Sequence, residues 1–163
     1  MGIIGHALKD IEPASVYNMP SHGNGVWAPS IRYHNGEFYI YWGDPDYGVF
    51  MVKTKNPAGE WEKPVCVIPG PGNIDSTPLW DEDGRCYLVS AYANSRSRFA
   101  SVIVVRELSA DGTKLSVILL LFLMVMERRT ELVKVQSFIR GMGGIGLCAS
   151  RWSSYRIPAC YEI

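Results

Sequence analysis

Residues 25–42 read GVWAPSIRYHNGEFYIYW, a Trp-Ala-Pro opening, a turn and an aromatic strand within one β-hairpin. The pattern recurs at residues 74–88, which read IDSTPLWDEDGRCYL, with Gly84 and Tyr87 lying 48 residues after Gly36 and Tyr39. A period of this length is typical of propeller blades, small antiparallel sheets that bury their faces against neighbouring blades. Two copies are too few to close a ring.

Short β-branched or aromatic runs alternate with turn dipeptides along the first two thirds of the chain, and together they predict an all-β meander. The dipeptides Asn35-Gly36 and Asp83-Gly84 predict tight primed hairpin turns, because these turns need positive φ, which Gly and Asn tolerate best. The predicted strands cover residues 38–42, 49–54, 65–68, 86–92 and 100–108.

The composition limits the class of partner. The chain has 163 residues, 47% hydrophobic and 12% aromatic, which suits one domain built from short strands. Its formal net charge is zero, so we expect no nucleic-acid partner and no membrane partner, because both need a clustered excess of Lys and Arg. Residues 1–9 show no secretory signal, and the localisation of any longer parent stays open.

The four cysteines lack the pair spacing of metal ligands and the density of a disulfide framework. We therefore expect no metal site and no disulfide scaffold, and interpret them as buried free thiols. They are Cys66, Cys86, Cys148 and Cys160.

The character of the sequence changes after Lys114. Residues 117–126 are ten consecutive apolar residues, fewer than the about 20 that cross a bilayer, and they predict a buried strand or an aggregation hazard. The remainder is rich in Gly, Arg and Ser, without strand alternation. We expect residues 115–163 to be a separate tail of uncertain structure.

Residues 2–114 resemble glycoside hydrolase family 43, the five-bladed β-propeller enzymes that include β-xylosidases and α-L-arabinofuranosidases. The resemblance implies that residues 1–114 are part of such a propeller, the end of its first blade followed by two blades. The family's catalytic base would then lie before Met1, so no residue here takes that role. The motifs are GVWAP (25–29), YHNGEFY (33–39), MVKTKNP (51–57), GEW (59–61), GNID (72–75), DEDG (81–84) and ELSADG (107–112).

The tail can be tested against the genetic code. Permitted codons for residues 134–148, read from the third base, give GPKFYKRNGWYWIM, and a permitted codon for Val133 supplies a preceding Glu. Permitted codons for residues 149–160, read from the second base, give PAGGVVTGYQL and then Ala. Both strings resemble the family, the first around its general acid. We therefore expect residues 115–163 to be a frameshifted translation with at least two frame changes.

The resemblance implies inverting hydrolysis, in which an acid protonates the leaving oxygen while a base activates water, with about 6.5 to 9.5 Å between the carboxyl groups. A third carboxylate tunes the acid, and Asp75 matches that position because it follows Ile74 just ahead of the second hairpin. Its negative charge would raise the pKa of the acid and keep it protonated. From spacing alone, the alternative is a turn or cap residue.

Trp27 matches an aromatic residue that lines the sugar pocket in the family, where an indole face packs on the apolar C–H face of a pyranose. Blade packing is the alternative for Trp27, and it is our expectation for the other tryptophans of residues 1–114. We expect the two histidines named below to be solvated loop residues and the three adjacent acids to form an exposed hairpin turn. We expect the last two acids to lie in a loop that at most borders the pocket. These residues are Trp42, Trp61 and Trp80; His22 and His34; Asp81, Glu82 and Asp83; and Asp44 and Asp46.

The sequence thus predicts an all-β chain from a hydrolase of xylose- or arabinose-type glycosidic bonds, with a pentose-containing oligosaccharide or polysaccharide as partner and no cofactor. As translated, the chain itself is expected to be incomplete and inactive. One alternative is a non-catalytic carbohydrate-binding or scaffold module. Another is a protein-interaction propeller of the kelch or WD type, against which Asp75 at a strand start counts.

Overall fold

The computed structural model describes the backbone of residues 2–11, 14–18, 23–98, 102–124, 132–141, 144–152 and 159–162, with side chains up to Ser116. His22 lies outside the described residues, so the expectation for this histidine is not addressed by the structure.

Within this range the chain forms three antiparallel sheets and two four-residue helices, which confirms the predicted all-β class. Each of the five predicted strands overlaps a strand of the structure. The first sheet is β1 (Trp27–His34), β2 (Glu37–Asp44), β3 (Gly48–Thr54) and β4 (Val65–Pro69) in that order; the second is β5 (Asn73–Trp80), β6 (Cys86–Tyr92), β7 (Val102–Leu108) and β8 (Leu115–Met124); the third is β9 (Leu132–Gly141), β10 (Gly144–Trp152) and β11 (Ala159–Glu162); the helices are α1 (Ala14–Tyr17) and α2 (Asn94–Ser97).

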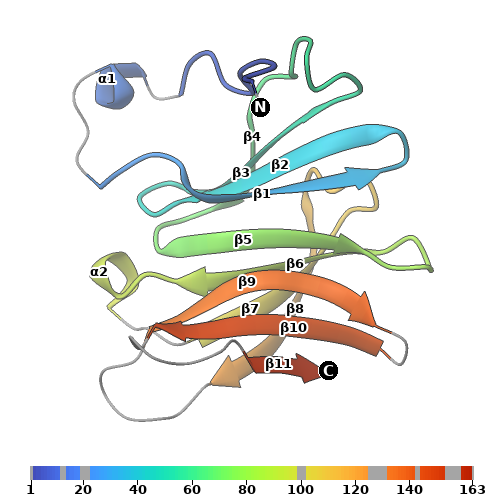
Figure 1. Ribbon diagram of the computed structural model, residues 1–163. Helices are drawn as coiled ribbons and strands as arrows, with labels where there is room; N and C mark the ends of the chain where they lie inside the picture. The colour runs from blue at the N-terminus through green and yellow to red at the C-terminus, as the bar shows by residue number, and fades with distance from the viewer. Residues whose placement is uncertain are drawn as a thin grey trace.

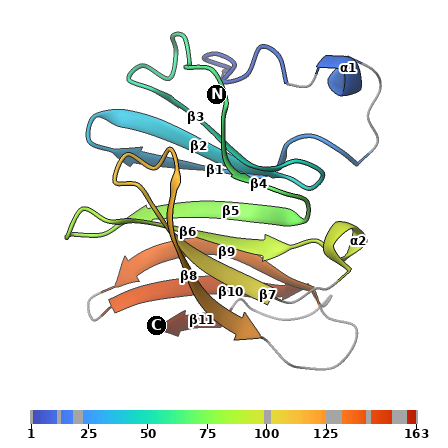
Figure 2. The ribbon, with the colours of Figure 1, turned by 180° about the vertical axis from the view of Figure 1, so that it is seen from behind.

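The sheets are stacked in chain order (Figure 1, Figure 2). The first strand of the first sheet, β1, lies against β5, and β9 packs against β5 and β6. The strands β1, β5 and β9 all begin at the same end, on the left in Figure 1, where α2 also lies. We call this the leading end of the sheets.

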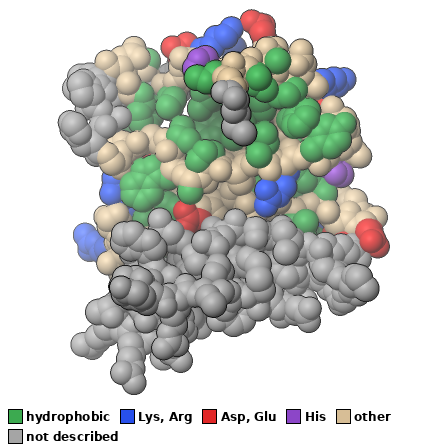
Figure 3. All heavy atoms as spheres, in the orientation of Figure 1, with side chains coloured by type: hydrophobic (Ala, Val, Ile, Leu, Met, Phe, Trp, Pro, Cys, Tyr) green, Lys and Arg blue, Asp and Glu red, His purple; other side chains and the backbone are tan. Residues whose placement is uncertain are grey.

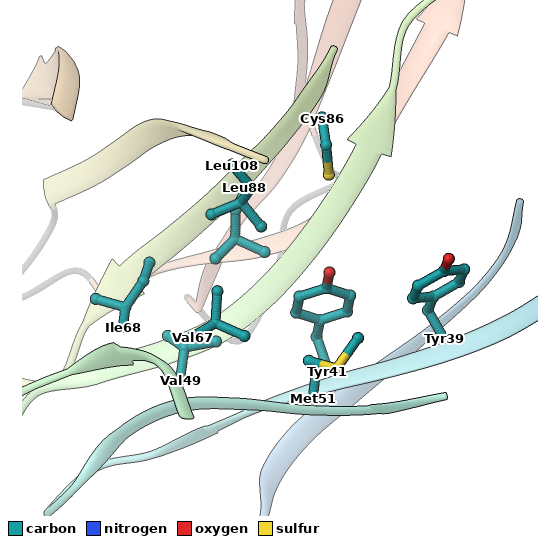
Figure 4. Close-up of a cluster of buried hydrophobic side chains, with 9 residues drawn as sticks. All are labelled: Tyr39, Tyr41, Val49, Met51, Val67, Ile68, Cys86, Leu88 and Leu108. Atoms are coloured by element: carbon teal, nitrogen blue, oxygen red, sulfur yellow. The ribbon is translucent and has the colours of Figure 1, made fainter. Parts of the chain in front are cut away.

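Two hydrophobic clusters form on the two faces of the second sheet, because alternate residues of a strand point to opposite faces. In the larger cluster, side chains of β2, β3 and β4 meet those of β6 and β7 (Figure 4). Its buried members are Tyr39, Tyr41, Val49, Met51, Val67, Ile68, Cys86, Leu88 and Leu108. The smaller cluster contains Ile74, Val89, Ala91, Ala93 and Ile103.

The two repeated hairpins turn differently. Asn35 and Gly36 both have positive φ, 46° and 83°, which confirms the predicted primed turn between β1 and β2. In the second hairpin only Gly84 does, at 80°, and the Asp81 N–H donates to the carbonyl of Arg85. The predicted primed turn at Asp83-Gly84 is therefore wrong, because a three-residue loop ending in a left-handed glycine closes this hairpin instead.

The loop of the second hairpin has one residue more than the loop of the first. The repeat is therefore shifted by one residue in the strand that precedes the loop. Tyr39 pairs with Arg32, whereas its counterpart Tyr87 pairs with Leu79. Equivalent residues of β1 and β5 are thus 47 apart, one fewer than the spacing read from the sequence.

The part of the chain after residue 114 also forms strands where the structure describes it. The apolar run predicted as a strand overlaps β8, which pairs with β7 and so continues the second sheet. The strands β9, β10 and β11 were not predicted, because their residues show no sustained alternation of hydrophobic and polar types. Whether residues 115–163 are a frameshifted tail stays a prediction.

Candidate functional site

Asp75 lies in an irregular part of β5. The ladder between β5 and β6 changes register between Ile74 and Thr77, which marks a bulge, and within it Asp75 has a φ of 53°. A non-glycine residue in this left-handed region is uncommon. A bulge redirects a side chain and is frequent beside active sites. Asp75 is only 7% exposed, so the strained backbone holds an acidic side chain in the interior.

The same bulge occurs in the first sheet. The ladder between β1 and β2 changes register between Trp27 and Ser30, and Ala28 within it has a φ of 40°. Ala28 lies 47 residues before Asp75, which is the spacing of equivalent residues in β1 and β5. The repeated bulge therefore redirects one side chain in β1 and one in β5. Of these two side chains, only that of Asp75 carries a charge.

Trp27 stands at the start of β1, paired with Gly43 of β2. Its half-buried ring packs against the smaller hydrophobic cluster, which contains Ile74, the residue before Asp75. Both predicted site residues thus lie at the leading end, on neighbouring first strands.

Gly43 allows the two sheets to approach closely at this point. A Cβ added to Gly43 would lie 2.4 Å from the carbonyl oxygen of Asn73 and 2.7 Å from the Cα of Ile74. Only a residue without a side chain fits against the backbone of β5 here. The sequence of β2 therefore sets how near the starts of β1 and β5 can come.

Side chains also connect the two first strands. The Ser30 hydroxyl donates to the carbonyl of Ser76 at 2.7 Å, next to Asp75 in sequence. One step further along β1, the Arg32 guanidinium lies 3.4 Å from the Thr77 hydroxyl. These contacts fix β1 against the bulge of β5.

Buried polar atoms flank Asp75. Asn73 and Ser76 are 3% and 0% exposed. Among the described residues, Asn73 Oδ1 and Ser76 Oγ have no hydrogen-bond partner. Leaving such a group unpaired costs about 1–3 kcal/mol. Together with the bulge, these groups make the start of β5 energetically unfavourable, as is typical of a site selected for function rather than stability.

Arg96 of α2 covers Trp27. Its guanidinium carbon lies 5.6 Å from the centroid of the indole ring. The same guanidinium donates to Asp46 Oδ1 at 3.0 Å and to the carbonyl of Gly23 at 2.9 Å. The sequence did not single out Arg96, since an arginine in a short connection carries no pattern.

Two predictions about other polar residues are wrong. His34 is not a solvated loop residue: it ends β1, stacks on Trp80 with the ring centroids 4.6 Å apart, and has its pKa lowered by burial. Asp44 is not in a loop either, because it ends β2 and is 1% exposed. Asp44 Oδ1 accepts the N–H of Asp46, and Oδ2 accepts the hydroxyl of Tyr17, whose pKa burial raises.

Some of the other expectations are confirmed, but Asp81 is half-buried rather than exposed, and Trp61 is half-buried and belongs to neither hydrophobic cluster. Glu82 and Asp83 are exposed in the second hairpin, and Asp46 is exposed in the turn after β2. Trp42 is buried and stacks on Phe50.

A cavity of about 550 Å³ lies between residues 6–11 and the face of the first sheet that points away from the second sheet. Trp42, Phe50 and Trp61 line it, whereas Trp27 and Asp75 do not. Hydrophobic side chains gather on the upper part of the molecule in Figure 3. We do not assign this cavity to the candidate site, because the bulge of β5 and the buried Asp75 lie elsewhere.

Within the described residues, no group of three or more His, Cys, Asp or Glu side chains is arranged to hold a metal ion. No helix in the same part of the chain is long and apolar enough to span a bilayer. Cys86 is a buried free thiol, as predicted, but Cys66 is an exposed free thiol, so the prediction of burial is wrong for Cys66. The side chains of Cys148 and Cys160 lie outside the described residues.

Comparison with known proteins gives matches of one kind. A family model described as glycosyl hydrolases family 43 matches residues 4–120. A β-xylosidase from Formosa agariphila is 30% identical over 122 residues, covering 69% of this chain and 21% of that protein. A non-reducing end α-L-arabinofuranosidase from Bacteroides ovatus is 40% identical over 93 residues, covering 54% and 17%.

Solved structures share the architecture. An α-L-arabinanase from Cellvibrio cellulosa matches with a TM-score of 0.65 at 18% identity, covering 94% of this chain and 55% of that chain. A xylan β-1,4-xylosidase from Bacillus halodurans C-125 matches at 0.61 and 20% identity, covering 84% and 27%. These likenesses confirm the predicted β-propeller fold. The chain spans about a fifth of the length of the curated relatives that it matches.

Proposed function

The chain belongs to glycosyl hydrolase family 43, and on this premise we propose that it derives from an enzyme that hydrolyses xylose- or arabinose-type O-glycosidic bonds of plant polysaccharides with inversion. The names of its relatives, a β-xylosidase and an α-L-arabinofuranosidase, support this substrate class. The observation that carries the proposal is Asp75, a buried acid held in a strained bulge at the same end as Trp27.

Asp75 acts in this proposal through a second carboxyl group. A buried carboxylate near a carboxylic acid raises the pKa of that acid, since two like charges at close range are unfavourable. The acid then stays protonated at neutral pH and donates its proton to the leaving oxygen. No cofactor enters the chemical step. Among the described residues we assign neither the general acid nor the general base.

Trp27 contributes the apolar wall of the site. A pyranose or furanose ring has a C–H face that packs on an indole, and the contact removes water from the reacting bond. Trp27 is half-buried, so part of the residue stays accessible.

We further propose that the first two sheets, Trp27–Pro69 and Asn73–Met124, are consecutive blades of a five-bladed propeller. Each is a four-stranded antiparallel meander with a bulged first strand, and the two pack face to face. In such a ring the first strands line the axis, which suits the position of Asp75.

The general acid belongs, in our proposal, to the shifted reading of the tail. In that reading an Asn-Gly pair is encoded across codons 141–143. This position agrees with the register of the third sheet, where Gly141 of β9 pairs with Gly144 of β10. The glutamate of the same reading is encoded across codons 133 and 134, within the first residues of β9. Because β9 packs against β5, the acid would come near the strand of Asp75.

The site is tested by measuring, with NMR, the binding of xylobiose to the full chain. We expect Trp27→Ala to abolish binding and Trp61→Ala, which alters the cavity on the other face, to leave it unchanged. Loss of binding in Trp61→Ala with retention in Trp27→Ala would place the sugar elsewhere.

Turnover separates the proposal from its alternative. The gene product read in the restored frame, including any upstream sequence, is incubated with xylo- and arabino-oligosaccharides, and the anomer released is followed by NMR. Release of a pentose of inverted configuration supports the hydrolase. Binding without release supports the non-catalytic carbohydrate-binding module.

A further inference from the structure

We propose that Arg96 is the positioning residue that fixes the plane of the Trp27 ring in the sugar site, an inference that rests on the proposed function for its link to substrate. Three observations carry it: the stacking of the guanidinium on the indole, the acceptors that hold the guanidinium, and the attachment of α2 to the strand of Asp75.

The guanidinium is held from three directions. It donates to Asp46 Oδ1 at 3.0 Å in the turn after β2, and to the Gly23 carbonyl and Asn24 Oδ1 at 2.9 and 3.2 Å in the segment before β1. The side chains of Arg96 and Asp46 are 25% and 36% exposed. A planar group fixed by several acceptors loses its freedom to rotate, so it presents one defined face.

That face meets Trp27. The distance of 5.6 Å from Arg96 Cζ to the ring centroid is within the range of a cation–π contact. Arginine suits this role because its planar fork stacks and donates hydrogen bonds at the same time, whereas lysine offers a point charge. The contact covers part of one face of the indole and leaves sugar to pack on the rest of the ring.

The helix that carries Arg96 is attached to the second blade. The Ala93 N–H donates to the Gly72 carbonyl at 2.8 Å, immediately before β5. A Cβ on Gly72 would lie 2.9 Å from the Cβ of Ser97, so the helix and the start of β5 are in close contact. Arg96 thus connects the strand of Asp75 to the ring of Trp27.

The test uses the full chain with ¹⁵N-labelled indoles, the Trp27 signal being identified by its absence in Trp27→Phe. We compare Arg96→Met with Arg85→Met, a matched control that removes an arginine and an exposed ion pair with Asp83. Without sugar, we expect the Trp27 indole signal to shift or broaden in Arg96→Met only. With xylobiose, we expect the affinity to fall about threefold to tenfold, and Arg96→Lys to be intermediate.

An unchanged Trp27 signal in Arg96→Met would overturn the inference. If Arg96→Met does not fold, Arg96→Lys replaces it, and an unchanged signal in that variant has the same meaning. The Trp27 signal could change in Arg96→Met although the parent chain does not bind xylobiose. That result supports the positioning role and contradicts the proposed function. A changed signal with unaltered sugar affinity would contradict the link between the ring plane and binding.

Discussion

Ala28 and Asp75 occupy the same place in the first and second sheets, each being the positive-φ residue of a bulge in a first strand. The fold therefore repeats the conformation while the sequence changes the side chain. Ala28 is exposed and Asp75 is buried, so the cost of the conformation can be measured at Ala28 without the complication of a buried charge.

Replacement of Ala28 by Val should destabilise the protein by about 1–2 kcal/mol, because a β-branched side chain is disfavoured at positive φ. Replacement by Asn should be neutral or slightly stabilising, since Asn tolerates this region. Thermal denaturation measures both, with Ile31→Val, an exposed change within the same strand, as the control. Equal stability of the Val and Asn variants would contradict the left-handed conformation at this position.

Replacement of Asp75 by Asn should lower the pKa of the glutamate that the shifted frame supplies in β9. The sign follows from charge: the carboxylate of Asp75 disfavours ionisation of a neighbouring acid, and an amide does not. The measurement is an NMR titration of the labelled glutamate in a chain made with the restored frame. An unchanged pKa would show that the two groups do not interact, and Asp75 would then be a structural residue.

Replacement of Gly43 by Ala should lower stability by about 1–3 kcal/mol, because the new methyl group overlaps the backbone of Asn73 and Ile74. The first two sheets would have to separate at the leading end. Gly2→Ala is the control, since nothing lies within 4 Å of a Cβ at that position. The same melting temperature for both variants would show that the first two sheets are not in close contact at Gly43.

His34 should make stability depend on pH. Its folded pKa is lowered by burial, so the unfolded chain binds the proton more readily, and stability falls as the pH drops below the ordinary histidine value of about 6.5. Melting temperatures of the parent and His34→Gln between pH 5 and 8 measure this contribution as their difference. A difference that does not vary with pH would contradict the effect of burial on His34.

Much of the fold could be predicted from the sequence because the first two sheets repeat an aromatic hairpin at nearly constant spacing. Asn35-Gly36 predicted its hairpin correctly, since both residues adopt the positive φ that the dipeptide favours. Asp83-Gly84 predicted the position of a hairpin but not its geometry. One additional loop residue changed the register, and a repeat read by spacing alone does not reveal such a shift.

The site was only partly predictable. Asp75 and Trp27 follow from motif resemblance, and the structure places them at one end. The bulge that redirects Asp75 is a property of the ladder between β5 and β6, and the stacking of Arg96 depends on a contact across 69 positions of the chain. Neither produces a periodic pattern. The burial of Asp44 escaped prediction for the same reason, because an Asp-Pro pair predicts a loop while tertiary packing encloses it.

The proposed site has its full set of groups only if the shifted reading of the tail is the true one. Sequencing the DNA that encodes residues 115–163 and the bases upstream tests this most directly. We predict frame changes that restore EGPKFYKRNGWYWIM over codons 133–148 and the glutamate at the start of β9. DNA that confirms the present frame, or codons that cannot supply this reading, would contradict it and leave Asp75 without an acid to tune.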